Sequence, residues 1–321
     1  MLRKTLLSAA VSVALVVSLE ATLRWFPLYN PIAHYVTEPP GPPPTDSWMV
    51  ADPLIGWRLR PDFRRGPADK YATSNHGGFR GPNEIDGSDA PIVVVGDSFV
   101  YGTGVADDET FAAQLERFLQ GPRVLNLGMP GFGIDQIALT VRHYALPLKP
   151  RLIVVGVVDL DFERTLVAYN HGRRFVRPQV ILVNGEEKPR PTSAGPIIGW
   201  LDARSRLLRA GRLALEHLSH YYPIGAWWTA NAEWLADIQI QTQSRGVPVL
   251  FVHLPTREGT PFPMLAKHFA ATHAQYLDLG DEPPRAEWYI PNDLHPSVEG
   301  HRRIAERIWA LIRHGEPVKT P

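Results

Sequence analysis

The chain has 321 residues, of which 44% are hydrophobic and 21% charged, a composition typical of one large globular domain with additional segments. Lys plus Arg and Asp plus Glu both number 33, so no excess of positive charge indicates nucleic-acid binding. Because the chain contains no cysteine, disulfide bonds, thiolate metal sites and a cysteine nucleophile are excluded.

The N-terminal end of the chain predicts a membrane segment. Two basic residues precede residues 5–19, which carry no charge and are rich in Leu, Val and Ala. The apolar stretch reaches the roughly 20 residues of a spanning helix only if it extends over 5–26 and includes Glu20 and Arg24. We therefore expect a single-pass anchor over 5–26, and a signal peptide that is cleaved after secretion is the alternative.

The segments around this anchor predict the domain organisation. Basic residues before a membrane segment favour the cytoplasm, so residues 1–4 are expected there and the bulk of the chain outside it. We expect a Pro-rich linker over 27–45, one folded domain over 46–315 and a short tail over 316–321. A helical insertion over about 162–226 is expected to shape the substrate cleft.

Two segments rich in aromatic residues and glycine, 52–58 and 75–81, lie before the first strong strand signal. Large aromatic side chains are more often buried than used for ligand contact. Trp57 and Phe79 are therefore expected to pack against the edge of the sheet, with Arg80 stacked or paired beside them.

The strand that follows carries the first candidate for chemistry. Residues 92–95 are all apolar and β-branched, which predicts a buried strand; Gly96-Asp97-Ser98 then forms a polar turn before an amphipathic helix over 111–119. Ligands of open α/β sheets bind at the carboxyl ends of strands, so the Ser98 hydroxyl lies where a reactive group is useful. A strand end closed by an Asx or Ser turn is the alternative interpretation.

Two further buried strands are predicted before the middle of the chain. Residues 124–127 predict a strand that leads through a glycine-rich loop to a helix over 134–144. The order of these glycines matches neither a dinucleotide-binding loop nor a phosphate-binding P-loop. Residues 152–158 predict a strand that ends at two acids, Asp159 and Asp161.

The rest of the chain alternates helices and strands. Residues 180–183 followed by Asn184-Gly185 predict a short hairpin. Apolar patterns predict helices over 200–222, 227–243, 262–272 and 302–313, and buried strands over 247–254 and 275–279. The alternation predicts an α/β fold, a three-layer α/β/α sandwich with a mostly parallel sheet, preceded by one N-terminal apolar helix.

An acid and a histidine, Asp293 and His295, stand just before the last predicted helix. A histidine can take a proton from a serine hydroxyl, and a neighbouring carboxylate can hold the imidazole in the required tautomer. Capping of the last helix by the same two side chains is the alternative.

Several motifs, in this chain order, resemble those of the SGNH, or GDSL, hydrolases. The first is Gly96-Asp97-Ser98 after a strand, the second is a glycine, Gly131, five residues after Asn126, and the last is the His-Pro-Ser run before the final helix. The two aromatic segments are similar to those that precede the first motif in a bacterial, N-terminally anchored subgroup. This similarity implies that the folded domain lies on the periplasmic side of a bacterial inner membrane.

The resemblance implies a flavodoxin-like three-layer fold and a role for each motif residue. Ser98 would be the nucleophile, His295 the general base and Asp293 the residue that orients it. The backbone N–H groups of Ser98 and Gly131 would form the oxyanion hole.

The third strand departs from the family pattern, Gly-x-Asn-Asp, because Asp159 or Leu160 stands at the place of the Asn and Asp161 at that of the Asp. An ionised Asp accepts hydrogen bonds but cannot donate one, so the usual third oxyanion donor is missing. We expect one of the two acids to turn towards Arg164 or a backbone amide. Further residues expected to line the site are Asp97, Asn126, Asp159, Asp161 and Asn170.

The resulting expectation is a serine-dependent ester hydrolase of the esterase, lipase or deacetylase type that acts outside the cytoplasm through an acyl-enzyme. The expected partners are a small ester or an acylated glycan and, through the N-terminal helix, the membrane; no nucleic acid, metal or cofactor is expected. Two alternative functions remain. The missing Asn favours a catalytically weakened binding or assembly protein, and the second alternative is an O-acyltransferase that acts on envelope glycans.

Overall fold

The computed structural model describes residues 11–12, 14–22, 47–64, 72–84, 90–165, 180–183, 185–189, 205, 207–208, 224–256 and 263–314. Asn170, most of the predicted helix over 200–222 and most of the predicted insertion over 162–226 lie outside the described residues. The predicted domain boundaries stay predictions.

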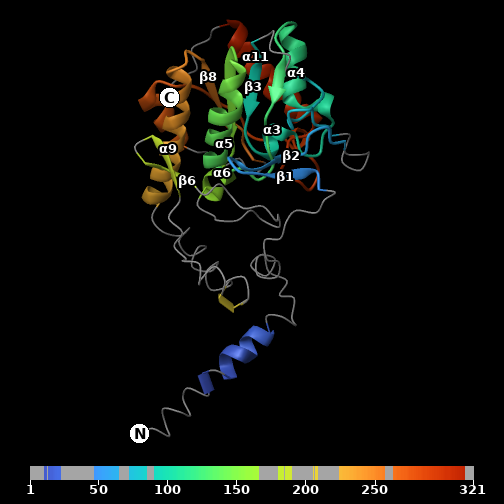
Figure 1. Ribbon diagram of the computed structural model, residues 1–321. Helices are drawn as coiled ribbons and strands as arrows, with labels where there is room; N and C mark the ends of the chain where they lie inside the picture. The colour runs from blue at the N-terminus through green and yellow to red at the C-terminus, as the bar shows by residue number, and fades with distance from the viewer. Residues whose placement is uncertain are drawn as a thin grey trace.

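A five-stranded parallel sheet forms the centre of the fold (Figure 1). Its strands are β3 (Ile92–Val95), β4 (Val124–Asn126), β5 (Leu152–Val157), β8 (Val249–His253) and β9 (Gln275–Asp278). They lie in the order β4-β3-β5-β8-β9, and every neighbouring pair is parallel, which confirms the predicted sheet. Because β4 and β5 flank β3, the strand order reverses at β3, and folds of this kind bind ligands at the carboxyl ends of the strands at such a point.

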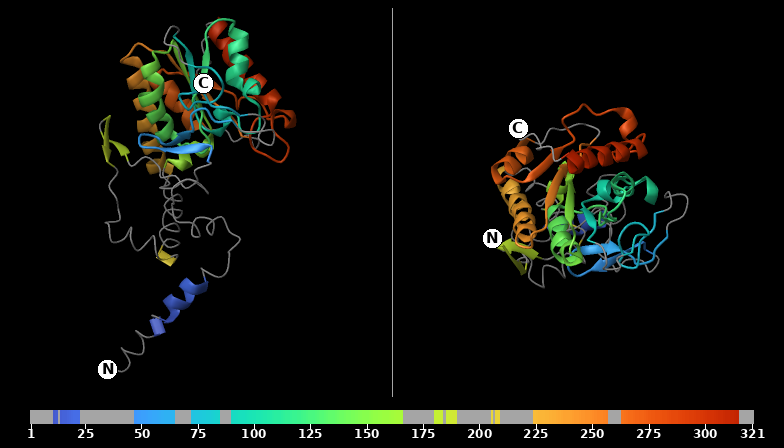
Figure 2. Two further views of the ribbon diagram at one scale, coloured as in Figure 1. Left: turned by 45° about the vertical axis from the view of Figure 1, so that its right-hand side comes forward. Right: turned by 90° about the horizontal axis from the view of Figure 1, so that it is seen from above.

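The sheet is covered on both faces, as the views in Figure 2 show. Successive side chains of a strand point to opposite faces, so Val93 and Val95 belong to one hydrophobic core whereas Ile92 and Val94 belong to the other. The helices α5 (Ile134–Thr140), α9 (Ile224–Gln243) and α10 (Pro263–Thr272) cover the first face, and α4 (Phe111–Leu119) and α11 (Val298–His314) cover the second. The predicted three-layer sandwich is confirmed.

Short elements complete the described part of the domain. They are the antiparallel pair β1 (Met49–Asp52) and β2 (Gly56–Leu59), the hairpin of β6 (Val180–Val183) and β7 (Glu186–Pro189), and the short helices α3 (Ser98–Tyr101) and α6 (Asp159–Arg164). The predicted hairpin is therefore confirmed. The helix predicted over 134–144 is α-helical only to Thr140 and then continues as a π-helical turn over Val141–Ala145.

The last helix begins at Val298, four residues before the predicted start at Arg302. Ser297 explains the difference, because its hydroxyl accepts from the Gly300 N–H at 3.2 Å and its carbonyl from the His301 N–H at 2.8 Å, as in a helix N-cap. His301 is buried and its Nδ1 accepts from the Phe111 N–H at 3.2 Å, which joins α11 to the start of α4. Burial lowers the pKa of His301 to about 3, so the ring is neutral and can accept.

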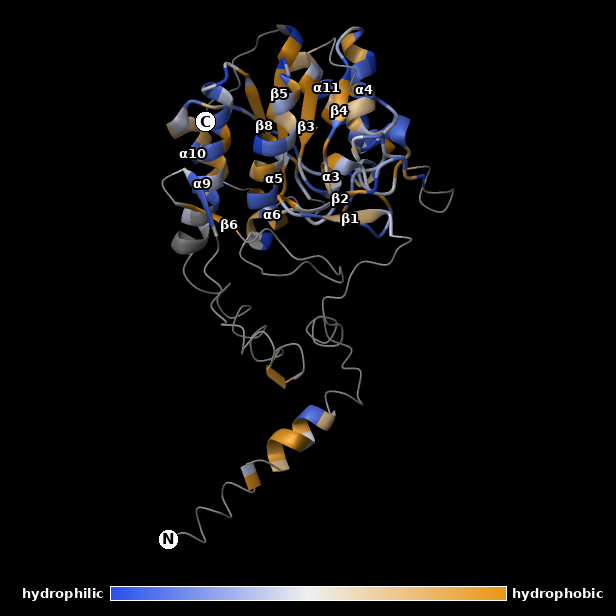
Figure 3. Cartoon of the chain, in the orientation of Figure 1, coloured by the Kyte–Doolittle hydropathy of each residue, from blue (hydrophilic) through white to orange (hydrophobic). Residues whose placement is uncertain are grey.

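The N-terminal described residues, 11–12 and 14–22, are helical and mostly apolar (Figure 3). Their exposed apolar side chains are Val11, Leu15, Val16, Val17 and Leu19. Within the described ranges, no helix has both the length and the apolar character needed to cross a membrane. Residues 5–10, 13 and 23–26 of the predicted spanning helix lie outside the described residues. The Glu20 carboxylate accepts from Ser205 Oγ at 3.0 Å and from the Leu207 N–H at 2.9 Å.

Candidate active site

Ser98 follows the carboxyl end of β3, the strand that lies between β4 and β5, and is the first residue of α3. Asp97 caps this helix, since its Oδ1 accepts from the Phe99 N–H at 2.8 Å. A Cβ at Gly96 would lie 2.2 Å from Val100 Cγ2, so only glycine permits this sharp turn between strand and helix. The Ser98 N–H belongs to the first helical turn, where N–H groups have no partner within the helix.

His295 lies between Ser98 and Asp293, as predicted from the order of the motifs. Its Nε2 is 2.9 Å from Ser98 Oγ, and its Nδ1 is 2.6 Å from Asp293 Oδ1. The same carboxylate oxygen accepts from the backbone N–H of His295 at 2.9 Å. Residues almost 200 positions apart in sequence therefore form a continuous hydrogen-bonded row with the order and distances of a Ser-His-Asp triad.

The charge of Asp293 fixes the tautomer of the imidazole. Partial burial alone would raise the pKa of Asp293, but the hydrogen bonds from the backbone and ring of His295 outweigh it and hold the pKa below its usual value. An ionised carboxylate only accepts, so His295 Nδ1 carries a proton, and in the neutral ring Nε2 is then the acceptor that faces Ser98.

Gly131 occupies a tight turn at the carboxyl end of β4. The Phe132 N–H donates to the Met129 carbonyl at 3.2 Å, with Pro130 and Gly131 as the central residues. The φ of Gly131 is +85°, as required at the third position of a type II turn, where glycine is preferred. The oxyanion role of the Gly131 N–H stays a prediction.

Trp57 packs against this turn from the hydrophobic core on one face of the sheet. Its ring is fully buried and packs edge-on against Phe132, with 5.5 Å between ring centroids, and its Nε1 donates to the Pro130 carbonyl at 3.3 Å. The predicted packing role of Trp57 is confirmed, and its partners Pro130 and Phe132 are the residues on either side of Gly131.

Asn126 supports the site through the backbone around it. Its Nδ2 donates to the Val100 carbonyl of α3 at 2.8 Å, and its Oδ1 accepts from the Gly128 N–H at 2.9 Å. A Cβ at Gly128 would lie 2.3 Å from the Tyr101 nitrogen, so the loop after β4 packs directly on α3. Asn126, which was expected to line the site, is buried and joins these two segments.

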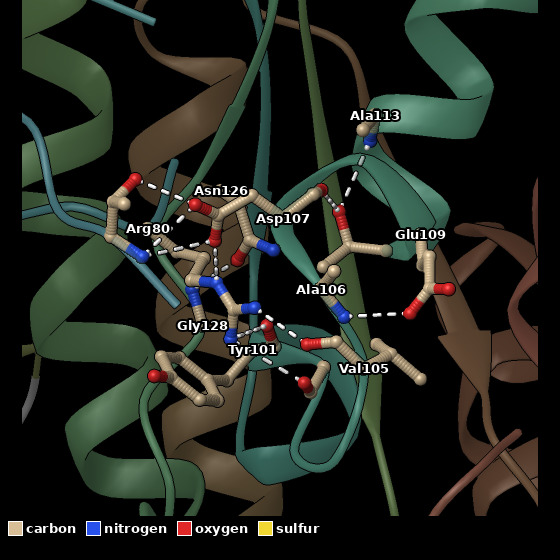
Figure 4. A network of polar contacts seen from close by, with 12 residues as sticks. Arg80, Tyr101, Val105, Ala106, Asp107, Glu109, Ala113, Asn126 and Gly128 are labelled. Carbon is tan, nitrogen blue, oxygen red and sulfur yellow. Dashed lines mark hydrogen bonds and ion pairs between the residues drawn. The ribbon is translucent and has the colours of Figure 1, made fainter. Parts of the chain in front are cut away.

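Arg80 holds the other end of α3, as Figure 4 shows. The guanidinium donates to the carbonyls of Tyr101, Gly102 and Val105, at 3.3, 3.4 and 2.8 Å, and forms an ion pair with Asp107. It also lies over the Tyr101 ring, 4.3 Å from its centroid. Arg80 therefore stacks on Tyr101 and pairs with Asp107, rather than stacking on Trp57 or Phe79 as expected, and these contacts hold the C-terminal end of the helix that begins with Ser98.

The two acids after β5 turn in different directions. Asp161 is fully buried; its Oδ1 pairs with Arg164 Nη1 at 2.8 Å and its Oδ2 accepts from the Val158 N–H at 2.9 Å. Burial and the neighbouring Asp97 carboxylate raise the pKa of Asp161 well above its usual value, although Arg164 opposes this rise. The expectation that one acid turns towards Arg164 and a backbone amide is therefore confirmed for Asp161.

Asp159 instead takes part in a second cluster at the same edge of the sheet, which the sequence did not indicate. His253, the last residue of β8, is buried between two carboxylates, with Nε2 3.2 Å from Asp159 Oδ1 and Nδ1 2.8 Å from Asp278 Oδ1. Burial opposes the charged ring, but the hydrogen bonds to both carboxylates outweigh it and raise the pKa of His253 to about 9. No group of metal-ligating side chains suited to an ion occurs within the described ranges.

The raised pKa of His253 predicts a loss of stability at alkaline pH. The folded protein holds the proton more tightly than the unfolded chain, whose histidine has a pKa near 6.5, so the stabilisation is complete below about 6.5 and is lost as the pH rises through about 9. Urea unfolding between pH 6 and pH 9.5 should show a decrease on the order of 3 kcal/mol that His253→Gln lacks. Equal pH slopes for both proteins would contradict the prediction.

The known proteins to which this chain is similar are remote. No model of a protein family matches the chain, and no curated protein does. Solved structures that are similar include that of TesA, with 14% identity over 70% of this chain and 98% of that chain and a TM-score of 0.45. A GDSL-like lipase from Bacteroides thetaiotaomicron has 13% identity over 70% and 87% of the two chains and a TM-score of 0.38.

A catalytic mutant of an acetylxylan esterase from Geobacillus stearothermophilus is similar to the same degree, with 15% identity over 74% of this chain and 100% of that chain and a TM-score of 0.41. Structures as remote as these do not indicate the activity of this chain. The chemistry of the site therefore has to be inferred from the side chains that form it.

Proposed function

We propose that the protein is a serine-dependent ester hydrolase that works through an acyl-enzyme, as the SGNH resemblance implies. The observation that supports it is the placement of the His295 ring between Ser98 Oγ and the Asp293 carboxylate, at 2.9 and 2.6 Å. A packed structural histidine needs no serine at the carboxyl end of β3, whereas a nucleophile needs both a base and a group that orients the base.

The geometry supports the following sequence of steps. Ser98 Oγ attacks the ester carbonyl carbon while His295 Nε2 takes the hydroxyl proton, and the negative charge on the former carbonyl oxygen is stabilised by the N–H groups of Ser98 and Gly131. His295 then gives its proton to the departing alcohol, which leaves Ser98 acylated. A water molecule attacks the acyl carbon while His295 takes its proton. His295 then returns this proton to Ser98 Oγ as the acid leaves, so both side chains are restored.

The test uses a chromogenic acetyl ester and a serine-reactive fluorophosphonate. We expect the wild type to hydrolyse the ester and to gain one phosphonate group on the peptide that contains Ser98, and Ser98→Ala to do neither. A wild type that is neither labelled nor active would favour the binding or assembly protein. A product that forms only with an added glycan acceptor would favour the O-acyltransferase.

We further propose that the domain is tethered to a membrane and acts outside the cytoplasm on a small ester or an acylated glycan. This rests on the basic residues before the apolar N-terminal segment and on the exposed apolar side chains of its described helical part.

Membrane tethering predicts a simple fractionation result. The full-length protein should stay in the membrane pellet through an alkaline carbonate wash, because an inserted apolar segment is not released by removing charge interactions. A soluble product that begins near residue 20 or later would show that the segment is a cleaved signal peptide instead.

A further inference from the structure

Arg164, the last residue of α6, touches both turns that carry the predicted oxyanion donors. Its Nη1 donates to Asp97 Oδ2 at 2.9 Å and to the Phe132 carbonyl at 3.1 Å. Asp97 directly precedes Ser98, and Phe132 directly follows Gly131. One guanidinium nitrogen therefore joins the turn after β3 to the turn after β4.

The arginine is itself held to the sheet by a buried acid. Nη1 also pairs with Asp161 Oδ1 at 2.8 Å, and the other oxygen of Asp161 accepts from the Val158 N–H, next to the end of β5. The carboxylates of Asp97 and Asp161 are almost fully buried, and the Arg164 side chain is 17% exposed. Charge-assisted hydrogen bonds in such surroundings are short and strong, so the position of the nitrogen is well defined.

We propose that Arg164 is the positioning residue of the oxyanion hole, a role that rests on the proposed hydrolase function. Without an Asn side chain from the third strand, the hole depends on two backbone N–H groups that come from different turns. Such donors stabilise a transition state only if they are fixed in advance at the place where the charge develops. Arg164 fixes the relative placement of the two turns by bonding to the residue beside each donor.

Arg164 also controls the charge beside the nucleophile. Asp97 Oδ2, the atom bonded by Arg164, lies 3.1 Å from Ser98 Oγ and competes with His295 for the single hydroxyl proton. The guanidinium charge makes this oxygen a weaker competitor and offsets the repulsion between the Asp97 carboxylate and the negative charge that develops on the substrate. Loss of Arg164 would therefore both loosen the donors and leave an uncompensated buried carboxylate next to Ser98.

The test compares Arg164→Met with Arg142→Met as a matched control. Arg142 is 15% exposed and also pairs with two carboxylates, Glu187 and Asp237, but it lies on the π-helical turn after α5. Both variants lose a partly buried ion-paired arginine, and both should be less stable. We expect only Arg164→Met to lower kcat for the acetyl ester, by about 10²-fold, with KM changed by less than about threefold.

Two further measurements separate positioning from general loosening of the fold. A boronic acid forms a tetrahedral adduct on the serine and depends on the oxyanion donors, so its affinity should fall with kcat in Arg164→Met and stay unchanged in Arg142→Met. Arg164→Lys keeps the charge but loses the planar fork, and it should recover kcat to within about tenfold of the wild type. If Arg164→Met does not fold, the test uses Arg164→Lys, which should be stable and have a kcat below that of the wild type.

The outcomes distinguish the two proposals. Suppose that the wild type is active and that the Arg164 variants equal it in kcat and in boronate affinity. This result would overturn the positioning role alone. An inactive wild type that is not labelled by the phosphonate would overturn the hydrolase function and the positioning role together.

Discussion

Replacing His295 by Ala is expected to lower kcat for a simple ester by roughly 10⁴- to 10⁶-fold, the loss found when a triad base is removed. Without Nε2 at 2.9 Å, the general base of the triad is missing, and the hydroxyl is a poor nucleophile near neutral pH. The side chain is 22% exposed and makes its main contacts with Ser98, Asp293 and the Phe99 ring, so the fold should persist.

His143→Ala provides a control for this experiment. His143 is 26% exposed and its Nε2 is 2.8 Å from the Glu187 carboxylate, so it resembles His295 in exposure and pairing, but it lies on the turn after α5. Its loss should leave kcat within about twofold of the wild type. A His295→Ala variant that keeps more than a tenth of the wild-type kcat would rule out His295 as the general base.

Replacing Arg80 by Met is expected to cost about 3–5 kcal/mol of unfolding free energy, the range seen when one partner of a buried ion pair is removed. Its side chain is almost fully buried, and the substitution leaves Asp107 and three carbonyl groups without their charged donor. Because two of those carbonyls, from Tyr101 and Gly102, lie at the end of the helix that begins with Ser98, ester hydrolysis should fall as well. Urea unfolding at pH 7 measures the stability change.

Arg302→Met is the matched control for Arg80→Met. Arg302 also pairs with two carboxylates, Glu299 and Glu306, but it lies on the exposed face of α11, where water and salt screen the charges. The unfolding midpoint of this variant should stay close to that of the wild type. Equal midpoints for Arg80→Met and Arg302→Met would show that the buried network adds no stability.

The sequence by itself determined the layers of the fold and the order of the triad. The apolar β-branched runs at β3 and β5 can be buried on both faces only in a sheet covered by helices, and the observed cores lie on both faces. Ser98, Asp293 and His295 were found because each lies beside a local signal that can be recognised without knowledge of distant residues. Ser98 follows a strand end, and Asp293 and His295 precede the start of the last helix.

Only the tertiary structure decided which charged groups meet around that triad. Arg164 bonds Asp97, 67 positions away, and His253 bonds both Asp159 and Asp278, 94 and 25 positions away. Residues at the carboxyl ends of neighbouring strands come together through the strand order, which local periodicity does not encode. Whether Asp159 or Asp161 turned to Arg164 depended on the direction of each side chain on α6, and that direction is set by the packing of the helix against the sheet.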